Sequence, residues 1–153
     1  MDKKLLDIVS YDGEGYIPLI DFEKWRVAEL RYIDELEADN LKDMQKHNET
    51  DEIFVLLEGD FTLFIGGQGD EIGEIEAVKL EPLQIYNVKK GTFHTHTPEK
   101  NATVLIVENA DTCDDNSPTV KLTKEQKAII KELYLKAVSY THLRAHETRR
   151  HLV

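Results

Sequence analysis

The chain has 153 residues, of which 41% are hydrophobic and 32% charged, so it holds enough apolar material for one folded domain and is not a disordered segment. Its 30 acidic residues outnumber its 19 basic ones, and the formal net charge of -11 disfavours nucleic acid and anionic membranes as partners. Cys113 is the single cysteine, and no apolar run has the length of a signal peptide or a membrane span. We therefore expect a cytoplasmic protein without an internal disulfide.

The first third of the chain predicts one strand. Residues 1–20 are mixed in character, and Pro18 disfavours a helix there. Residues 24–33 predict a strand with one buried face, because apolar side chains alternate with charged ones. Residues 35–44 are polar and predict either a short helical turn or a loop.

From residue 53 onward, short strands are predicted to follow one another. They cover residues 53–57, 61–65, 74–80, 85–89, 92–97 and 103–108. The turn sequence Glu58-Gly59-Asp60 predicts a hairpin between the first two. Several short strands separated by turns rich in Gly and Asp indicate an all-β sandwich or barrel.

A helix is predicted after the last strand. Thr123 is a suitable N-cap, and Gln126 three residues later completes a capping box. The apolar residues that follow at helical spacing are Ala128, Ile129, Ile130, Leu133 and Tyr134. We expect this helix to pack on the outside of the barrel.

The last stretch, residues 138–153, differs from the rest in being rich in arginine and histidine. Its first part, VSYTHLRAHET (residues 138–148), resembles one translated reading frame of a sequencing adapter. We therefore predict a single domain over residues 1–137 followed by a non-native tail, and we exclude the tail histidines His142, His146 and His151 from any site. The alternative is a genuine basic C-terminal helix.

The three remaining histidines, His47, His94 and His96, fall in two clusters, each beside a predicted strand. Side chains two residues apart on a strand share a face, so Gln45 and His47 point the same way, as do His94 and His96. Glu52 opens the strand that follows the first cluster. Two such clusters can bring imidazoles and one carboxylate to a single point, a donor set that suits divalent transition metals.

Both clusters resemble the two motifs of the cupin family. In the first, His47, Glu52 and Gly59 stand at the spacing of that motif, with Gln45 at the place of its first histidine. In the second motif Gly91 and His94 match.

Two positions of the second motif depart from the family pattern, since Lys89 stands where proline is usual and Pro98 where asparagine is usual. The resemblance covers roughly residues 25–110. It implies an all-β cupin jelly-roll barrel, here with a C-terminal α-helix, and a metal bound inside it.

By this resemblance the metal ligands would be Gln45, His47, Glu52 and His94, and the ion would be Fe, Mn, Ni, Co or Zn. An amide oxygen is a weaker ligand than imidazole, so His96 or Glu49 is the candidate to compensate at the position of Gln45. The resemblance also implies pairing into a homodimer, and small molecules as ligands.

Two functions follow from this site. The first is a metal-dependent isomerase, lyase or dioxygenase acting on a small polar metabolite such as a sugar derivative or keto acid, with Glu49 and His96 as catalytic residues that move a proton. The second is a non-catalytic barrel that binds or senses a small molecule, an alternative favoured by Gln45. A metal-free barrel, in which the histidines are only polar packing, is the third possibility.

Overall fold

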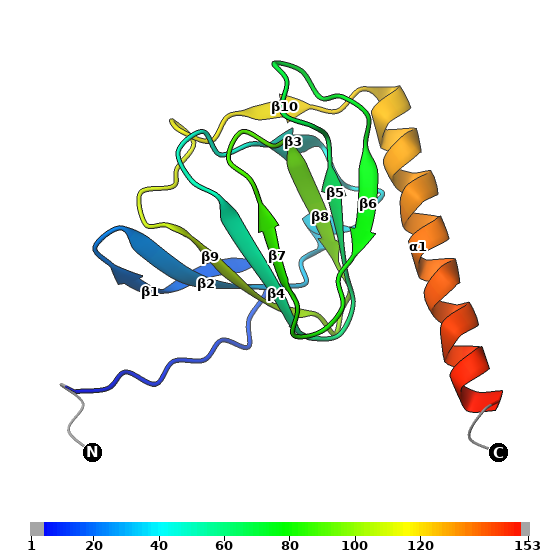
Figure 1. The fold of residues 1–153 in the computed structure, drawn as a ribbon, viewed down its shortest axis with the longest axis horizontal. Helices are drawn as coiled ribbons and strands as arrows, with labels where there is room; N and C mark the ends of the chain where they lie inside the picture. The colour runs from blue at the N-terminus through cyan, green and yellow to red at the C-terminus, as the bar shows by residue number, and fades with distance from the viewer. Residues whose placement is uncertain (1–4, 151–153) are drawn as a thin grey trace.

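The computed structural model describes residues 5–150, and between residues 141 and 150 the only side chain it describes is that of Arg144. Two five-stranded antiparallel sheets face each other (Figure 1). Sheet I has the strand order β1-β2-β9-β4-β7, and sheet II has the order β10-β3-β8-β5-β6. The strands are β1 (Tyr16–Phe22), β2 (Trp25–Arg31), β3 (Asp43–Gln45), β4 (Glu52–Glu58), β5 (Phe61–Ile65), β6 (Glu76–Lys79), β7 (Ile85–Val88), β8 (His94–Pro98), β9 (Thr103–Asn109) and β10 (Thr119–Lys121).

The all-β prediction is confirmed, and so are the strands predicted from residue 53 onward, to within about two residues at each end. The predicted hairpin at Gly59 is wrong. β4 pairs with β7 and β9, while β5 pairs with β6 and β8, so the chain crosses from sheet I to sheet II at this turn. Such crossings produce the jelly-roll topology, and a turn signal alone does not distinguish them from a hairpin.

Three strands lie outside the predicted set. β1 is an edge strand in which Pro18 precedes a register shift, a position where a missing N–H is tolerated. β3 and β10 pair with each other and have three residues each, too few to show a period. A short 3-10 helix, Asp34–Leu36, is consistent with the predicted helical turn.

Two apolar clusters stabilise the fold. The first lies between the sheets and contains the buried residues Ala28, Leu30, Phe54, Leu56, Phe61, Leu63, Leu80, Val88, Val104 and Ile106. The second lies between sheet II and helix α1 (Lys124–Arg150) and includes Phe64, Phe93 and Ile130. The barrel interior is therefore apolar at one end, and the site described below occupies the other part of it.

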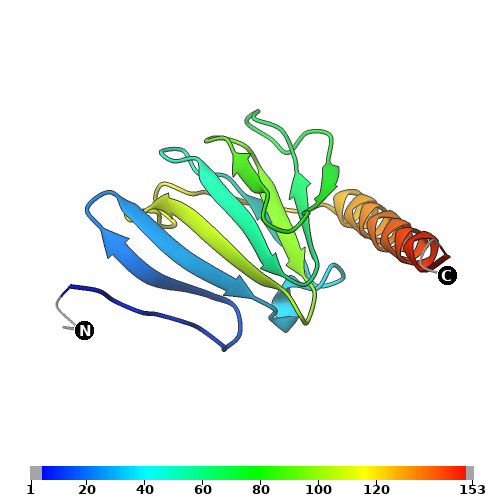
Figure 2. The same cartoon turned by 60° about the horizontal axis from the view of Figure 1, so that its bottom comes forward.

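Helix α1 packs on the outside of the barrel against β5 and β6, as predicted (Figure 2). The capping box is present, since the Gln126 N–H donates to Thr123 Oγ1 at 3.1 Å and the Thr123 N–H donates to Gln126 Oε1 at 2.9 Å. Ile130 is buried, but Ala128 and Ile129 are exposed, so the contact stripe is narrower than predicted. No helix in the described part of the chain is both long and apolar enough to cross a membrane.

Candidate metal centre

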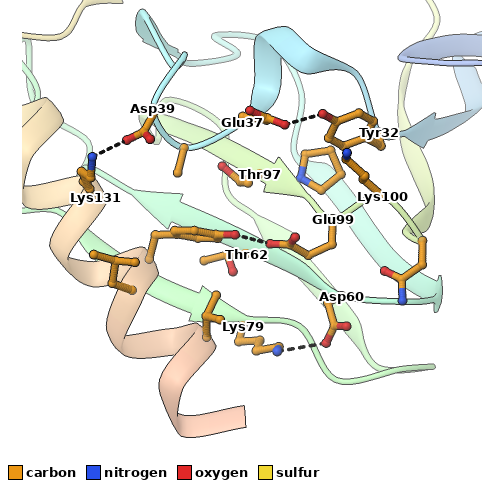
Figure 3. A pocket seen from close by; sticks show the side chains of 16 residues that line it. Tyr32, Glu37, Asp39, Asp60, Thr62, Lys79, Thr97, Glu99, Lys100 and Lys131 are labelled. Atoms are coloured by element: carbon orange, nitrogen blue, oxygen red, sulfur yellow. Dashed lines mark hydrogen bonds and ion pairs between the residues drawn. The ribbon is translucent and has the colours of Figure 1, made fainter. Parts of the chain in front are cut away.

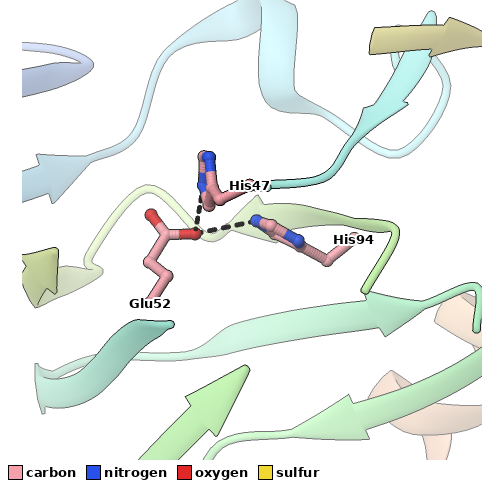
Figure 4. Close-up of side chains that lie close together, drawn as sticks. All are labelled: His47, Glu52 and His94. Carbon is pink, nitrogen blue, oxygen red and sulfur yellow. Dashed lines mark hydrogen bonds and ion pairs between the residues drawn. The ribbon is translucent and has the colours of Figure 1, made fainter. Parts of the chain in front are cut away.

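Three side chains from separate parts of the chain meet inside the barrel (Figure 4). His47 follows β3, Glu52 opens β4 and His94 opens β8. Glu52 Oε2 lies 3.0 Å from His47 Nε2 and 2.7 Å from His94 Nε2, and one possible ligand atom from each residue lies within 4.8 Å of the other two. All three are buried, so the structure brings together three of the four predicted ligands.

A chain of hydrogen bonds determines which nitrogen of His47 carries a proton. Asn116 Oδ1 accepts from the Cys113 N–H at 3.0 Å, and its Nδ2 donates to the Asp111 carbonyl at 3.0 Å, so the orientation of the amide is defined. The Ser117 hydroxyl donates to Asn116 Oδ1 at 3.0 Å. Its oxygen, 2.7 Å from His47 Nδ1, must therefore accept the Nδ1–H.

His94 is oriented in the same sense by the backbone. Its Nδ1 lies 2.9 Å from the Thr92 carbonyl oxygen, which can only accept. In the neutral forms of His47 and His94, Nε2 then carries the lone pair, and both lone pairs are directed at Glu52 Oε2. Outer contacts of this kind commonly orient histidines that bind metals.

The donor set requires a positive charge at its centre. Burial alone would raise the pKa of Glu52, but the hydrogen bonds with His47 and His94 lower it to about 2, so the carboxylate is ionised at neutral pH. Burial alone would lower the pKa of His47, but Glu52 and Glu108 raise it. Two imidazole lone pairs and one carboxylate oxygen this close together bind either a proton or a metal ion, and the set fits Fe, Mn, Co, Ni or Zn.

Gln45 lies at the edge of this site. It pairs in register with His94 across β3 and β8, and it lines the same cavity as His47 and Glu52. The amide is partly exposed, whereas the three converging residues are buried. Its place beside the group agrees with the predicted position, and its role as a ligand remains a prediction.

His96 shares the inner face of β8 with His94 but stands apart from the converging group. Its ring packs against Phe54, at 5.7 Å between centroids, and is stacked on Phe61 at 5.3 Å. Nδ1 is buried without a hydrogen-bond partner, and burial lowers the pKa of His96 to about 4. His96 is therefore a neutral ring in an apolar wall, outside the group formed by His47, Glu52 and His94.

Glu49 lies outside the cavity. It is exposed on the loop between β3 and β4, and its Oε2 accepts a long hydrogen bond of 3.5 Å from Asn116 Nδ2. The structure thus does not bring Glu49 into the cavity that contains His47, Glu52 and His94. The spacing of the motif gives the position of a loop residue along the chain, but not the direction in which its side chain points.

The site opens into a cavity of about 540 Å³ that contains a residue missed by the sequence interpretation. Glu108 on β9 is buried, and its Oε2 lies 3.9 Å from His47 Nε2. Its Oε1 accepts a hydrogen bond from the Tyr16 hydroxyl at 2.5 Å. Burial raises the pKa of Glu108, and the hydrogen bond from Tyr16 opposes this.

The sequence does carry a signal that Glu108 faces inward, since Val104, Ile106 and Glu108 follow each other on one face of β9.

Arg26 also lines this cavity. It is held by Asp21, whose carboxylate accepts from Nε at 2.8 Å and from Nη2 at 3.1 Å. The guanidinium charge is therefore paired with a carboxylate on the neighbouring strand β1.

A second cavity of about 640 Å³ lies outside the barrel, between sheet II and α1 (Figure 3). Several of its polar side chains are engaged with one another: Lys131 pairs with Asp39 at 2.9 Å, and Tyr134 donates to Glu99 at 2.5 Å. It contains none of the converging groups described above. The chemistry therefore points to the inner cavity.

Comparison with known proteins gives structural neighbours only. No protein-family model matches the chain, and no curated protein is detectably similar to it. Solved structures with a similar fold include Streptomyces Pac13, described as a nucleoside dehydratase, at 8% identity over 75% of this chain and 86% of that chain with a TM-score of 0.52. Others are a cupin-2 domain protein from Shewanella frigidimarina (15% identity, 65% of this chain and 84% of that chain, TM-score 0.47) and KdgF from Halomonas (13%, 65% and 81%, TM-score 0.46).

At identities this low, the likeness to Pac13 concerns the fold alone. The chain has the cupin fold, a jelly-roll barrel of two antiparallel sheets with one C-terminal helix.

Proposed function

We propose that the chain is a metal-binding cupin and works as a metal-dependent enzyme on a small polar metabolite. The observation that carries this proposal is the pair of imidazoles whose Nδ1–H groups are engaged elsewhere, so that both Nε2 atoms face Glu52. His47, Glu52 and His94 would hold the ion. A bound divalent ion supplies a Lewis acid that polarises an oxygen of the substrate.

The residues around the ion are suited to moving a proton. Glu108 Oε2 is 3.9 Å from His47 Nε2, faces the cavity and is oriented by the Tyr16 hydroxyl. In our proposal it takes the acid–base role that the sequence suggested for Glu49. His96 would contact the substrate as a neutral ring. Isomerase or lyase chemistry on a sugar derivative or keto acid uses these groups directly, and dioxygenase chemistry is the third candidate.

The cavity supports a small substrate. A volume of about 540 Å³ lies in the range of sites that enclose a metabolite. Pac13, which has a similar fold, has been crystallised with uridine, a small polar molecule. We also propose that the protein is cytoplasmic and that it forms a homodimer.

Metal content tests the proposal. The protein would be prepared with His142, His146 and His151 replaced by alanine, so that the C-terminal histidines bind no ion, and its metal would be measured by mass spectrometry. Near-stoichiometric metal, lost in His47→Ala and in His94→Ala but retained in His96→Ala, is the expected result. A protein that takes up none of Fe, Mn, Ni, Co and Zn would refute the metal centre.

The second candidate function is a barrel that binds or senses a small molecule without converting it. Gln45, at the place where the family motif has a histidine, favours this alternative because it weakens the donor set. A metal-free protein that still binds a metabolite in the cavity would support it, whereas turnover that depends on added metal would support the enzyme.

A further inference from the structure

Carboxylates predominate among the charged groups that line the inner cavity. Among the described residues that line it, Arg26 is the single lysine or arginine, whereas five carry a carboxylate. These five are Glu35, Asp43, Glu52, Glu108 and Asp114. Glu52 and Glu108 are buried beside His47, so they belong to the candidate metal centre itself. The other three carboxylates form a separate group, nearer to solvent.

Glu35, Asp43 and Asp114 are exposed and together form the acidic rim of this cavity. They come from three separate segments, which are the short 3-10 helix, β3 and the loop between β9 and β10. Asp43 lies two residues before Gln45 on β3, so the two side chains share the face of that strand that borders the cavity. Within the described part of the chain, none of the three rim carboxylates makes an ion pair. The exposed side of the cavity is therefore bordered by negative charges that no neighbouring cation offsets.

Two lysines that stand near the metal centre in the sequence do not line this cavity. Lys46 directly precedes His47, but its ammonium group lies over the ring of Phe93, 4.6 Å from the ring centroid. Lys89, in the second motif, pairs with Asp51 at 3.3 Å. Both ammonium groups are thus engaged elsewhere, and an anionic molecule in the cavity would meet no lysine among the described lining residues.

Positive charge in the cavity is limited to Arg26 and, when it is bound, a divalent ion. The carboxylate of Asp21, which does not line the cavity, accepts from two nitrogens of Arg26, so the charge of this guanidinium is already offset. Even with the ion in place, five carboxylates face at most three positive charges. An excess of negative charge remains if Glu108 is protonated, so the cavity as a whole is negative.

We infer that this cavity takes a substrate without negative charge, an uncharged or cationic hydroxycarbonyl compound such as a free sugar or an amino sugar, and disfavours keto acids and sugar phosphates. The inference rests on the function proposed above and narrows the substrate class of that site. A cleft lined by one sign of charge changes the local concentration of charged solutes by about tenfold or more. The acidic rim therefore depletes anions before they reach the centre, and the net charge of -11 of the whole chain acts in the same direction.

Cys113 allows the charge of the cavity to be measured directly. It is the only cysteine of the chain, it is exposed, and it lines the same cavity. Its labelling rates with two methanethiosulfonate reagents, one carrying a trimethylammonium group and the other a sulfonate, would be measured by mass spectrometry. Each rate is divided by that of the free thiol 2-mercaptoethanol. We expect the cationic reagent to be favoured at least about tenfold. The preference should shrink in about 1 M salt, where the Debye length is about 3 Å.

The double variant Glu35→Gln/Asp43→Asn removes two charges of the acidic rim and should reduce the preference at least about threefold. Both side chains are exposed, so their replacement does not disturb the core. Asp114 is left in place, because its neighbour in the sequence is the labelled cysteine. The matched control is Asp70→Asn/Glu71→Gln, which neutralises two exposed carboxylates between β5 and β6 that do not line the cavity. This control should leave the preference unchanged.

Equal normalised rates for the two reagents, or a preference that Glu35→Gln/Asp43→Asn leaves unchanged, would overturn the inference. Protection of Cys113 from labelling by glucose 6-phosphate at a lower concentration than by glucose would overturn it as well. The labelling is carried out on the metal-free and on the metal-loaded protein, and it does not depend on turnover. A protein that binds no metal can still show the preference, and a metal-binding protein can lack it, so failure of the metal centre and failure of this inference are distinguishable.

Discussion

The Ser117 hydroxyl accepts the Nδ1–H of His47 at 2.7 Å and thereby directs the other nitrogen of that ring at Glu52. Ser117 stands 70 residues from His47 along the chain, just before β10, yet it defines which form of the imidazole faces the site. The same contact keeps the ring from turning away when the centre is empty.

Ser117→Ala should therefore weaken metal binding. Loss of an outer partner of a histidine ligand typically costs about 10- to 100-fold in affinity, and His47 would lose the acceptor that orients it. Competition titration with a chelator of known affinity measures the change. Ser117→Thr, which keeps the hydroxyl, is the control and should retain most of the affinity. Equal affinities for all three proteins would show that Ser117 does not act through His47.

Metal affinity should decrease as the pH falls. The ion binds the neutral imidazole, and Glu52 raises the pKa of His47 in the metal-free protein. Protons therefore compete with the metal ion for His47 already at pH values above the usual histidine pKa of about 6.5. The carboxylate of Glu52, with a pKa of about 2, stays ionised over this range. We expect about a tenfold loss per pH unit for each proton displaced. An affinity that is constant from pH 5 to pH 8 would contradict this account.

The metal-free protein should show the opposite trend in stability. The raised pKa of His47 stabilises the fold, and this contribution is complete at pH values below the pKa of His47 in the unfolded chain. It is lost as the pH rises through the pKa of His47 in the folded protein. The depressed pKa of Glu52 contributes above about 4.5 and is lost as the pH falls toward about 2. Thermal unfolding of the metal-free protein should thus give a higher Tm near pH 7 than near pH 8.5, an interval above the usual histidine pKa in which His96, with a pKa of about 4, contributes little to the change. A Tm that rises over that interval would be inconsistent with a proton held between the ligands.

Glu108→Gln should separate metal binding from catalysis. Glu108 lies outside the three converging residues, so the metal content should stay that of the parent protein. Turnover of a substrate identified with the parent protein should fall by about 100-fold or more, as for other acid–base residues. Tyr16→Phe, which removes only the donor to Glu108, should give a smaller loss. If Glu108→Gln loses the metal, Glu108 is a ligand and not a proton carrier.

Gly59 should tolerate alanine less well than Gly67 does. Both have φ near +80°, a conformation that costs an L-residue about 1–2 kcal/mol. At Gly59, however, an added Cβ would lie 2.4 Å from the Asn101 carbonyl oxygen, whereas at Gly67 it would meet nothing within 4 Å. Urea denaturation should therefore give a larger loss for Gly59→Ala. Equal losses would mean that the turn between β4 and β5 relaxes without cost.

The sequence predicts those parts of the site whose relative positions are determined by short spacings along the chain. His47 lies in the connection that follows β3, and Glu52, five residues later, opens β4, so the spacing of the motif alone gives their relation. The alternation along β9 places Glu108 on the inner face, but its place beside His47 depends on β9 pairing between β2 and β4, which no local pattern reveals. The sequence could not place Glu49 relative to the cavity, since a polar loop gives no period from which to infer the direction of a side chain.

The most direct measurement is anomalous diffraction from crystals grown with Co²⁺ or Mn²⁺. We expect a peak within about 2.0–2.3 Å of His47 Nε2, His94 Nε2 and a carboxylate oxygen of Glu52. The same crystals would show whether Gln45 turns toward the ion. A map without a peak at this point, or with the ion bound only to the C-terminal histidines, would contradict the proposed metal centre.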